Sequence, residues 1–396
     1  MRISTGMIYD AGVASIQQQN SKLLDAQKQV ATGRRVLSPA DDPVASARAL
    51  EVSQSKSVND LYASNQAYAN DALKLVDSKL GSVTDLLTYV RTRAVESGNG
   101  TYSSSEFAAI ASDMTQQFSA LQSLANSQDS TGEYVFAGYR SNAQPFAGSL
   151  AGGITYQGDQ GQRSLQISAS RILPVTSSGD QIFNQIRAPA GSAYALAGAA
   201  NTGTALVSAT SLSGYNGHTY AISVGAGPAY QVFDSTADPT HASPITPTVT
   251  SSGSTTTLAF GGISMTLTGT PAAGDSYSLG TVAGAFDVLG NFVRSLQSGN
   301  AAVTAFGANQ AIAGMDAAQD SVSQVRSAVG SRMVEVESQQ NVTSAMTLQY
   351  SETLSNLQDA DYASAVSNLT QRSTYLQAAQ QSFMKVSNLS LFNYLS

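Results

Sequence analysis

The feature that most limits how this chain can fold is a helical pattern that runs without interruption over residues 43–97. Asp42 followed by Pro43 is a strong helix start, because the carboxylate can cap free backbone N–H groups and proline has no N–H that needs a partner. Apolar residues then recur every three or four positions as far as Ser97. At 1.5 Å per residue this is about 80 Å of helix. A compact domain of ordinary size has no room for it, so the pattern predicts a rod.

Helical patterns also occupy both ends of the chain. Residues 1–37 carry apolar residues at helical or heptad spacing, with Thr32-Gly33 as a plausible helix end. Ser103-x-x-Glu106 has the spacing of a capping box and predicts a third helix that stops before Thr131-Gly132. Helical spacing returns near Phe286 and then runs almost unbroken from Ala301 to the end. Neither end can bury its apolar stripe alone, so we expect the two ends to pack on each other and on neighbouring copies.

The middle of the chain has the pattern of β-structure. From Ala188 to Val293 there is no Lys or Arg, and Gly, Ser, Thr, Ala and Pro dominate. Because β-branched and aromatic residues recur there at strand intervals, we interpret this region as an inserted all-β domain rather than as disorder. The predicted strands, including those of a preceding hairpin-bearing loop region, lie at residues 133–139, 154–158, 165–168, 219–224, 230–233 and 263–268.

Composition excludes several classes of function. The 396 residues include 20 Lys and Arg against 27 Asp and Glu, a formal net charge of −7, and only 12% of residues are charged. The acidic balance argues against binding to nucleic acid or to an anionic membrane, both of which need clustered basic residues. Cysteine is absent and histidine occurs only twice, as His218 and His241, so most metal and acid–base chemistry is unavailable. No apolar run is long enough for a membrane span or a cleavable signal.

The few candidate reactive groups have simpler interpretations. Asp41 with Asp42, and Asp359 with Asp361, could act as acid and base, but helix capping explains them better. Arg34-Arg35 could contact phosphate, yet it stands beside a helix cap in an acidic chain. The two histidines lack a surrounding ligand motif and are expected at the surface. A glycan-acting enzyme would need convergent acids in the β region, where the available residues are Asp234, Asp238, Asp275 and Asp287. We therefore expect no catalytic residue, no cofactor and no metal.

Both ends of the chain resemble the flagellin family of bacterial axial proteins. The resemblance rests on the opening Met1-Arg2-Ile3-Ser4-Thr5, on residues 31–43 (ATGRRVLSPADDP), on residues 357–363 (LQDADYA) and on residues 376–380 (LQAAQ). It covers roughly residues 1–180 and 290–396. The form of the opening, the Pro-Ala-Asp-Asp-Pro segment and the closing residues 391–395 (LFNYL) are more similar to the subunits that join hook and filament than to filament flagellin.

The resemblance implies a mainly α fold with an inserted all-β domain. Long antiparallel coiled-coil-like helices from both termini would form an inner domain, a helical bundle with a β-hairpin would lie outside it, and a β domain would project to the surface. The expected division has residues 1–42 and 351–396 in the inner domain, residues 43–187 and 286–350 in the bundle, and residues 188–285 in the outer domain.

The resemblance also implies a structural subunit of the bacterial flagellum, not an enzyme. It would be exported unfolded through the flagellar type III apparatus with an export chaperone and without a cleavable signal peptide. It would then form a ring of copies at the hook–filament junction, between hook-associated protein 1 and flagellin. The inner-layer assembly contacts expected from the resemblance and the apolar stripes are Ile3, Met7, Ile16, Leu23, Val30, Leu369, Leu376, Phe383, Val386, Leu389, Phe392 and Leu395. A filament flagellin and a secreted adhesin are the alternative functions.

Overall fold

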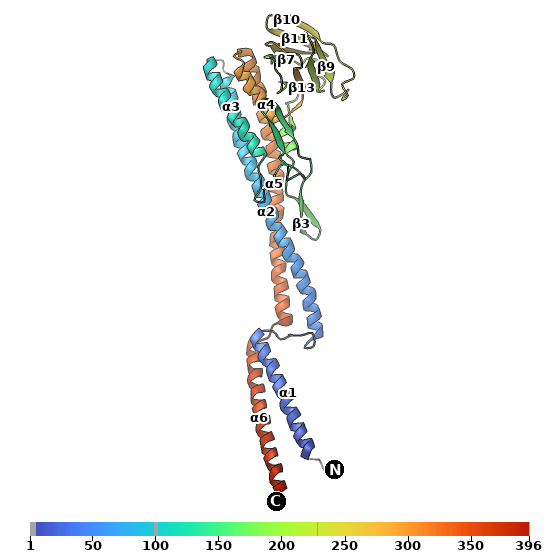
Figure 1. Ribbon diagram of the computed structural model, residues 1–396, viewed down its shortest axis with the longest axis vertical. Coiled ribbons are helices and arrows are strands. Elements are labelled where there is room, and N and C mark those ends of the chain that lie inside the picture. Colours follow the sequence, from blue (N-terminus) through green and yellow to red (C-terminus); the bar gives the residue numbers. More distant parts are fainter. Residues whose placement is uncertain (1–4, 99–101, 228, 396) are drawn as a thin grey trace. The chain divides into compact units, whose positions relative to one another are not determined.

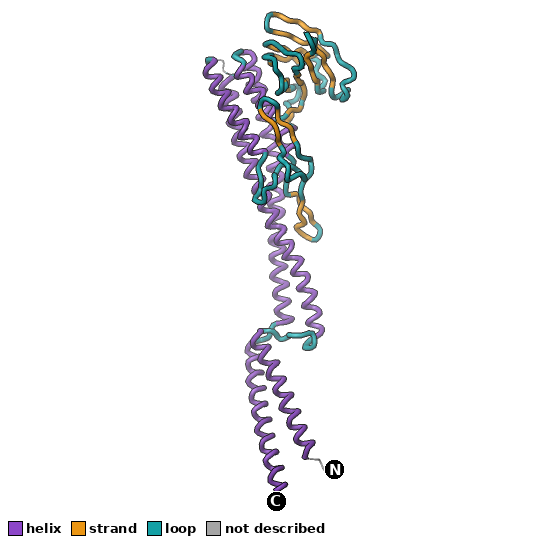
Figure 2. The backbone as a smooth tube through the Cα atoms, in the orientation of Figure 1, coloured by secondary structure: helices purple, strands orange, loops and turns teal. Residues whose placement is uncertain are grey.

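The chain folds into two units in a computed structural model, which describes residues 5–98, 102–227 and 229–395 and only the backbone of residues 5, 6, 8 and 386–395 (Figures 1 and 2). One unit comprises Met1–Ser64 with Gln339–Ser396, and the other comprises Asn65–Ser338. The helices are α1 (Thr5–Thr32), α2 (Pro43–Ser97), α3 (Ser104–Ala125), α4 (Ala285–Gln297), α5 (Ala301–Gln358) and α6 (Tyr362–Leu395). The bounds of α2 and the end of α1 at Thr32 confirm the sequence predictions.

Local capping explains where the helices begin. The carboxylate of Asp42 accepts a hydrogen bond from Ala45 N–H at 2.9 Å, as expected for the cap of α2. Ser103 and Glu106 form the predicted capping box at the start of α3. The helix predicted to run almost unbroken from Ala301 has one break, since it stops after Gln358 and restarts at Tyr362.

Another prediction fails at residues 133–139, which form turns instead of a strand. Only the central side chains Val135, Phe136 and Ala137 are buried in the core, whereas Tyr139 is exposed. The backbone binds loop groups instead of a partner strand: Phe136 C=O accepts from Gly179 N–H at 2.9 Å, and Ala137 C=O accepts from Asp159 N–H at 3.1 Å. A sequence pattern shows that a segment is apolar and extended, but a strand also needs a neighbouring strand to bond with.

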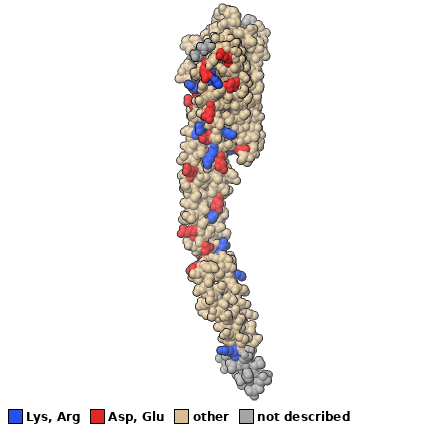
Figure 3. Space-filling model, turned by 90° about the vertical axis from the view of Figure 1, so that its left-hand side faces the viewer, with Lys and Arg blue, Asp and Glu red and all other residues tan. Residues whose placement is uncertain are grey.

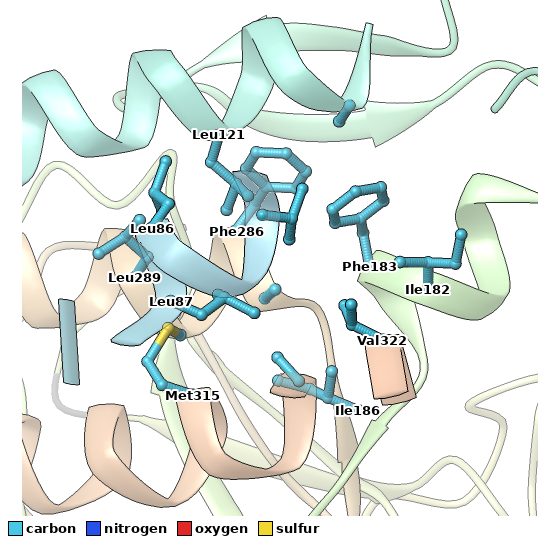
Figure 4. Packing of buried hydrophobic residues seen from close by; sticks show 14 of the residues in the cluster. Leu86, Leu87, Leu121, Ile182, Phe183, Ile186, Phe286, Leu289, Met315 and Val322 are labelled. Atoms are coloured by element: carbon cyan, nitrogen blue, oxygen red, sulfur yellow. The ribbon is translucent and has the colours of Figure 1, made fainter. Parts of the chain in front are cut away.

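The second unit contains a helical bundle with a continuous hydrophobic core. Residues of α2, α3, α4 and α5 and of the loops between them form one buried cluster. Figure 4 shows Phe183, Phe286, Leu121 and Met315 converging within it. Phe286 is the centre of an aromatic group, with its ring 5.4 Å from that of Phe146 and 5.6 Å from that of Phe118. Two antiparallel hairpins belong to this part, β1 (Phe146–Ser149) with β2 (Gly153–Tyr156) and β3 (Ser164–Ser168) with β4 (Arg171–Pro174), and so does the π-helix η1 (Asp180–Asn184).

The inserted region forms an antiparallel β domain with a core of its own, which confirms the predicted fold class. One four-stranded sheet has the order β10 (Thr248–Ser252), β11 (Thr255–Phe260), β12 (Ile263–Thr268), β7 (Leu206–Ser211). The other has the order β6 (Tyr194–Ala197), β13 (Ser276–Gly280), β8 (Tyr220–Val224), β9 (Tyr230–Asp234). Inward-facing residues of both sheets share one buried cluster that includes Ile222, Val232, Leu258 and Met265. Two further short strands, β5 (Ile186–Arg187) and β14 (Val282–Ala283), pair with each other.

Candidate assembly surface on the terminal helices

The helices α1 and α6 pack on each other in antiparallel orientation, although they are more than 300 residues apart in the sequence. Near the start of α1, the ring of Tyr9 lies 5.0 Å from that of Phe383, between centroids. Beyond its end, Arg34 forms a backbone bridge with Asp359, just before α6 begins. The first part of α1 therefore contacts the later part of α6. This confirms the prediction that the two ends of the chain pack on each other.

Half-buried residues form one stripe on each terminal helix. They recur every three or four positions, which is the period of a helix face. Six of the predicted assembly residues belong to these stripes, namely Ile16, Leu23, Val30, Leu369, Leu376 and Phe383. Met7 does not, since 66% of its surface is exposed. The stripes place the six residues between α1 and α6 of the same chain.

The remaining predicted residues lie outside the described part of the structure. Ile3 precedes the first described residue. For Val386, Leu389, Phe392 and Leu395 only the backbone is described, as part of α6.

The unit that contains α1 and α6 buries few hydrophobic side chains. Within its described residues, the buried hydrophobic side chains are Val36 and four alanines, namely Ala26, Ala45, Ala49 and Ala365. Of the 23 exposed large hydrophobic side chains in the described chain, 15 belong to this unit. The helix pair also carries few charged residues. The sequence of α6 has two, Arg372 and Lys385. The face of the molecule in Figure 3 shows few charged side chains over α1 and α6. Such a surface favours contact with other protein.

Sequence reasoning missed the residues that are now the best candidates for contacts with other copies. Tyr9, Leu24, Tyr362, Tyr375 and Met384 are between 46% and 64% exposed, on the same helices as the half-buried stripes. A signal in the sequence could have found three of them, because each adjoins a residue of the half-buried stripe and so lies one position off the helical period: Leu24 follows Leu23, Tyr375 precedes Leu376, and Met384 follows Phe383.

Two of the segments that carry the family resemblance, residues 31–43 and 357–363, meet in the structure and form a joint between helices. Arg35 N–H donates to Gln358 C=O at 2.7 Å, and Ala360 N–H donates to Gly33 C=O at 2.8 Å. Gly33 has a φ of 68°, a left-handed conformation that costs glycine little. The guanidinium of Arg35 donates to Leu357 C=O at 3.0 Å and to Asp42 at 3.3 Å. These contacts give Arg35 a structural role and explain why the helix breaks after Gln358.

The paired carboxylates cap this joint. Asp41 accepts from Ser38 N–H at 2.7 Å, and that bond chiefly lowers the pKa of the carboxyl group. The backbone N–H of Ala45 chiefly lowers the pKa of Asp42. At the start of α6, the hydroxyl of Ser364 donates to Asp361 at 2.8 Å and chiefly lowers its pKa. All three groups are held as carboxylates, which suits capping and not proton transfer.

The groups considered for enzyme chemistry are engaged in local structure. His218 pairs with Asp234 at 2.7 Å, and His241 stacks on Phe233 with ring centroids 5.0 Å apart. Asp275 is 1% exposed and accepts hydrogen bonds from Thr202 N–H and Ala272 N–H. Among the described residues, no three His, Asp or Glu side chains are grouped so as to hold a metal ion. None of the described helices is both long and apolar enough to cross a membrane.

Comparison with known proteins assigns both ends of the chain to one family. The family model for the bacterial flagellin N-terminal helical region matches residues 3–141, and the model for the C-terminal helical region matches residues 312–395. The chain belongs to the bacterial flagellin family. The two matched regions include the whole joint and both helices of the α1 and α6 pair, whereas the β domain lies between them.

Among members of this family, the chain is similar to hook-associated proteins. It is 35% identical to flagellar hook-associated protein 3 of Salmonella typhimurium and 32% identical to that of Escherichia coli, over 186 residues in each case. These alignments cover 47% of this chain and 58% of each relative. The alignments thus span less than two thirds of the length of these curated relatives.

Solved structures of the family share the fold. The crystal structure of FlgL from Xanthomonas campestris matches with a TM-score of 0.54 at 27% identity, over 77% of this chain and 99% of that one. Flagellar hook-associated protein 3 from Legionella pneumophila matches with a TM-score of 0.55 at 25% identity, over 77% of this chain and 98% of that one.

Proposed function

We propose that this protein is a non-enzymatic structural subunit of the bacterial flagellum that joins the hook to the flagellin filament. One observation carries the proposal: among the described residues of the unit built from the two ends of the chain, 15 large hydrophobic side chains are exposed, seven of them on α1 and α6, and the buried hydrophobic side chains are mainly alanine. A helix pair of this kind is weakly stabilised by itself and gains stability when its apolar surface is covered by other protein. The identity to hook-associated protein 3 supports the junction as the site where it is covered.

The half-buried stripe and the exposed residues have separate roles in this proposal. The predicted residues Ile16, Leu23, Val30, Leu369, Leu376 and Phe383 hold α1 to α6, so that the pair is presented as one element of the inner domain formed by residues 1–42 and 351–396. Met7, Tyr9, Leu24, Tyr375 and Met384 then contact neighbouring copies, and so do Ile3, Val386, Leu389, Phe392 and Leu395. The aromatic and methionine side chains among them suit such contacts, because both kinds bury a large area.

The partners follow from the position at the junction. A ring of copies would contact hook-associated protein 1 on one side and flagellin on the other, after export through the flagellar type III apparatus with a chaperone. The protein would lie outside the cell as part of the flagellum. The absence of cysteine is consistent with passage through a narrow export channel as an unfolded chain, since no disulfide can form.

Deletion of the gene in its host tests the proposal. Electron microscopy of the mutant should show hooks without filaments, and the culture medium should contain unpolymerised flagellin. Hooks without flagellin either attached or in the medium would instead identify a filament subunit. Normal filaments and normal motility would contradict both flagellar functions and favour an adhesin.

Truncation tests the assembly surface separately. Variants lacking residues 1–30 or residues 366–396 should keep a soluble, folded second unit, seen by circular dichroism, and should fail to restore filaments to the deletion strain. A full-length copy expressed at the same level is the control. Filament growth with both truncated variants would show that the terminal helices are not the assembly surface.

A further inference from the structure

The β domain is joined to the helical bundle by a narrow neck of two paired strands. The chain enters the domain through β5 and leaves it through β14, and these strands pair with each other, Ile186 with Ala283 and Arg187 with Val282. Ala188 N–H donates to Thr281 C=O at 2.8 Å just above them. A two-stranded ribbon is marginally stable alone and twists easily. The neck by itself would therefore leave the orientation of the β domain poorly fixed.

Strand β6 supplies a second connection, because it is buried on both faces. Tyr194 and Leu196 pack into the core of the helical bundle, whereas Ala195 and Ala197 pack into the core of the β domain. The alternation of side chains along a strand makes this possible. One strand of four residues thus belongs to two hydrophobic cores at once.

Helix α4 binds the end of the same strand through its backbone. The carboxamide oxygen of Asn291 accepts from Ala197 N–H at 2.9 Å, and the amide nitrogen of Asn291 donates to Ala197 C=O at 3.1 Å. The guanidinium of Arg294, one turn further along α4, donates to Ala197 C=O at 3.0 Å and to Ala199 C=O at 3.3 Å. Four hydrogen bonds therefore connect two side chains of α4 to three backbone groups of the β domain.

These bonds occupy a sheet edge that would otherwise be free. Strand β6 is the outer strand of its sheet and pairs only with β13 on its other side. An uncovered edge presents unpaired N–H and C=O groups. Asn291 satisfies both groups of Ala197 with one planar carboxamide, which copies the reciprocal pair of bonds that a neighbouring strand would make.

We propose that Asn291 and Arg294 lock the β domain to the helical bundle, so that neck, β6 and α4 together make the second unit one rigid body. The paired strands β5 and β14 attach the β domain to the bundle at one place. The hydrogen bonds to Ala197 and Ala199 attach it at a second place, at the end of β6. The orientation of the outer domain is then set by that of the bundle. All of these contacts lie within one chain, so the inference goes beyond the proposed function and does not depend on it.

Distance measurements between spin labels test the lock. The native chain has no cysteine, so Ser119→Cys at an exposed position of α3 and Ser252→Cys at an exposed position of β10 give two unique labels. Pulsed electron resonance reports the spread of the distance between them. A second pair, Ala237→Cys with Ser252→Cys, lies inside the β domain and reports its integrity. Each pair is measured in the parent chain, in N291A, in N291A/R294M and in N201A.

N201A is the matched control. The carboxamide of Asn201 makes the same reciprocal pair of bonds, accepting from Ser276 N–H at 2.8 Å and donating to Ser276 C=O at 2.8 Å, but both partners lie within the β domain. Its loss should not change how the domain is held on α4.

The lock predicts a single narrow distribution for the α3 to β10 pair in the parent and in N201A, and a distribution at least twofold broader in N291A/R294M. The pair inside the β domain should stay narrow in every variant. A broad distribution in the parent, an unchanged one in N291A/R294M, or equal broadening in N201A would overturn the proposal. If the distribution of the pair inside the β domain also broadens in N291A/R294M, the single variant N291A is used to test the proposal, with the same expected and contradicting results for the α3 to β10 pair.

Discussion

Phe383 packs against Gly12 so closely that no side chain fits between them. A Cβ atom built at residue 12 would lie 2.5 Å from Cδ2 of the Phe383 ring, and the ring also contacts that of Tyr9. Glycine normally weakens the interior of a helix. At this position it allows the backbone of α1 to approach an aromatic ring of α6, in a unit that has little other hydrophobic burial.

Gly12→Ala should therefore weaken the pairing of α1 with α6. Overpacking costs about 1–3 kcal/mol, which exceeds the gain of about 0.5–1 kcal/mol that alanine brings inside a helix. Hydrogen exchange of the α1 amides should become faster. Gly81→Ala is the control, because nothing lies within 4 Å of a Cβ there, and it should stabilise the protein by about 0.5–1 kcal/mol in urea unfolding. Slower exchange in α1 of the Gly12 variant would contradict the close contact.

Acid should loosen the joint between the helices. The pKa values of Asp41, Asp42 and Asp361 are lowered in the folded protein from the ordinary value of 3.8. A lowered pKa means that the capping bonds contribute their full stability above about pH 4 and lose it as the pH falls through the folded values. Titration of the amide resonances of Ser38, Ala45 and Ala363 should show midpoints below 3.8. Midpoints at or above that value would rule out these carboxylates as caps.

Asn59 should fix the register of α2 against α5. It is 5% exposed, and its amide donates to Thr343 C=O at 2.9 Å and to the Thr347 hydroxyl at 2.8 Å. Asn59→Ala should lower the free energy of unfolding by about 1–2 kcal/mol, since two buried hydrogen bonds are lost. The control Ser57→Ala removes only a local bond to Ser53 C=O and should change stability by less than about 0.5 kcal/mol. Equal effects in urea unfolding would show that the bonds across the helices are unimportant.

Exposed residues of α6 should matter for assembly but not for folding. Tyr375→Ser and Met384→Ser should leave the free energy of unfolding within about 0.5 kcal/mol of the parent value, as is usual at the surface, and should reduce filament formation when they replace the native gene. Gln377→Ser, an exposed polar position on the same helix, should have no effect on either. Phe286→Ala, by contrast, should cost about 3–5 kcal/mol, because the ring is 3% exposed in the bundle core. Full motility with both α6 variants would remove these residues from the proposed surface.

Local sequence signals predicted the helices better than the strands. Asp42-Pro43, Thr32-Gly33 and the Ser103 to Glu106 capping box mark helix ends, and the structure has the ends where these residues place them. Such signals act within one helical turn, so they can be read without the rest of the chain. Residues 133–139 have the composition of a strand but lack a partner strand, which no local pattern reveals.

The sequence predicted that the candidate surface lies on the two terminal helices, but not which of their apolar side chains are exposed. Apolar spacing indicated that both ends pack on each other, and they do. It could not separate Leu23, which is half-buried, from Leu24, which is 50% exposed. It also gave no reason for the helix to break after Gln358, because the break depends on backbone bonds to Gly33 and Arg35, more than 300 residues away.

The sequence by itself determined the end of α1, the starts of α2 and α3, the inserted β region and the family, because caps, periodicity and the terminal motifs depend on neighbouring residues. The tertiary structure alone decided which apolar side chains stay exposed, how residues 33–35 and 358–360 form a joint, and that β6 contributes to two cores. Each of these depends on contacts between segments distant in sequence, and the free energy of burial is set by the surface that those segments remove from water.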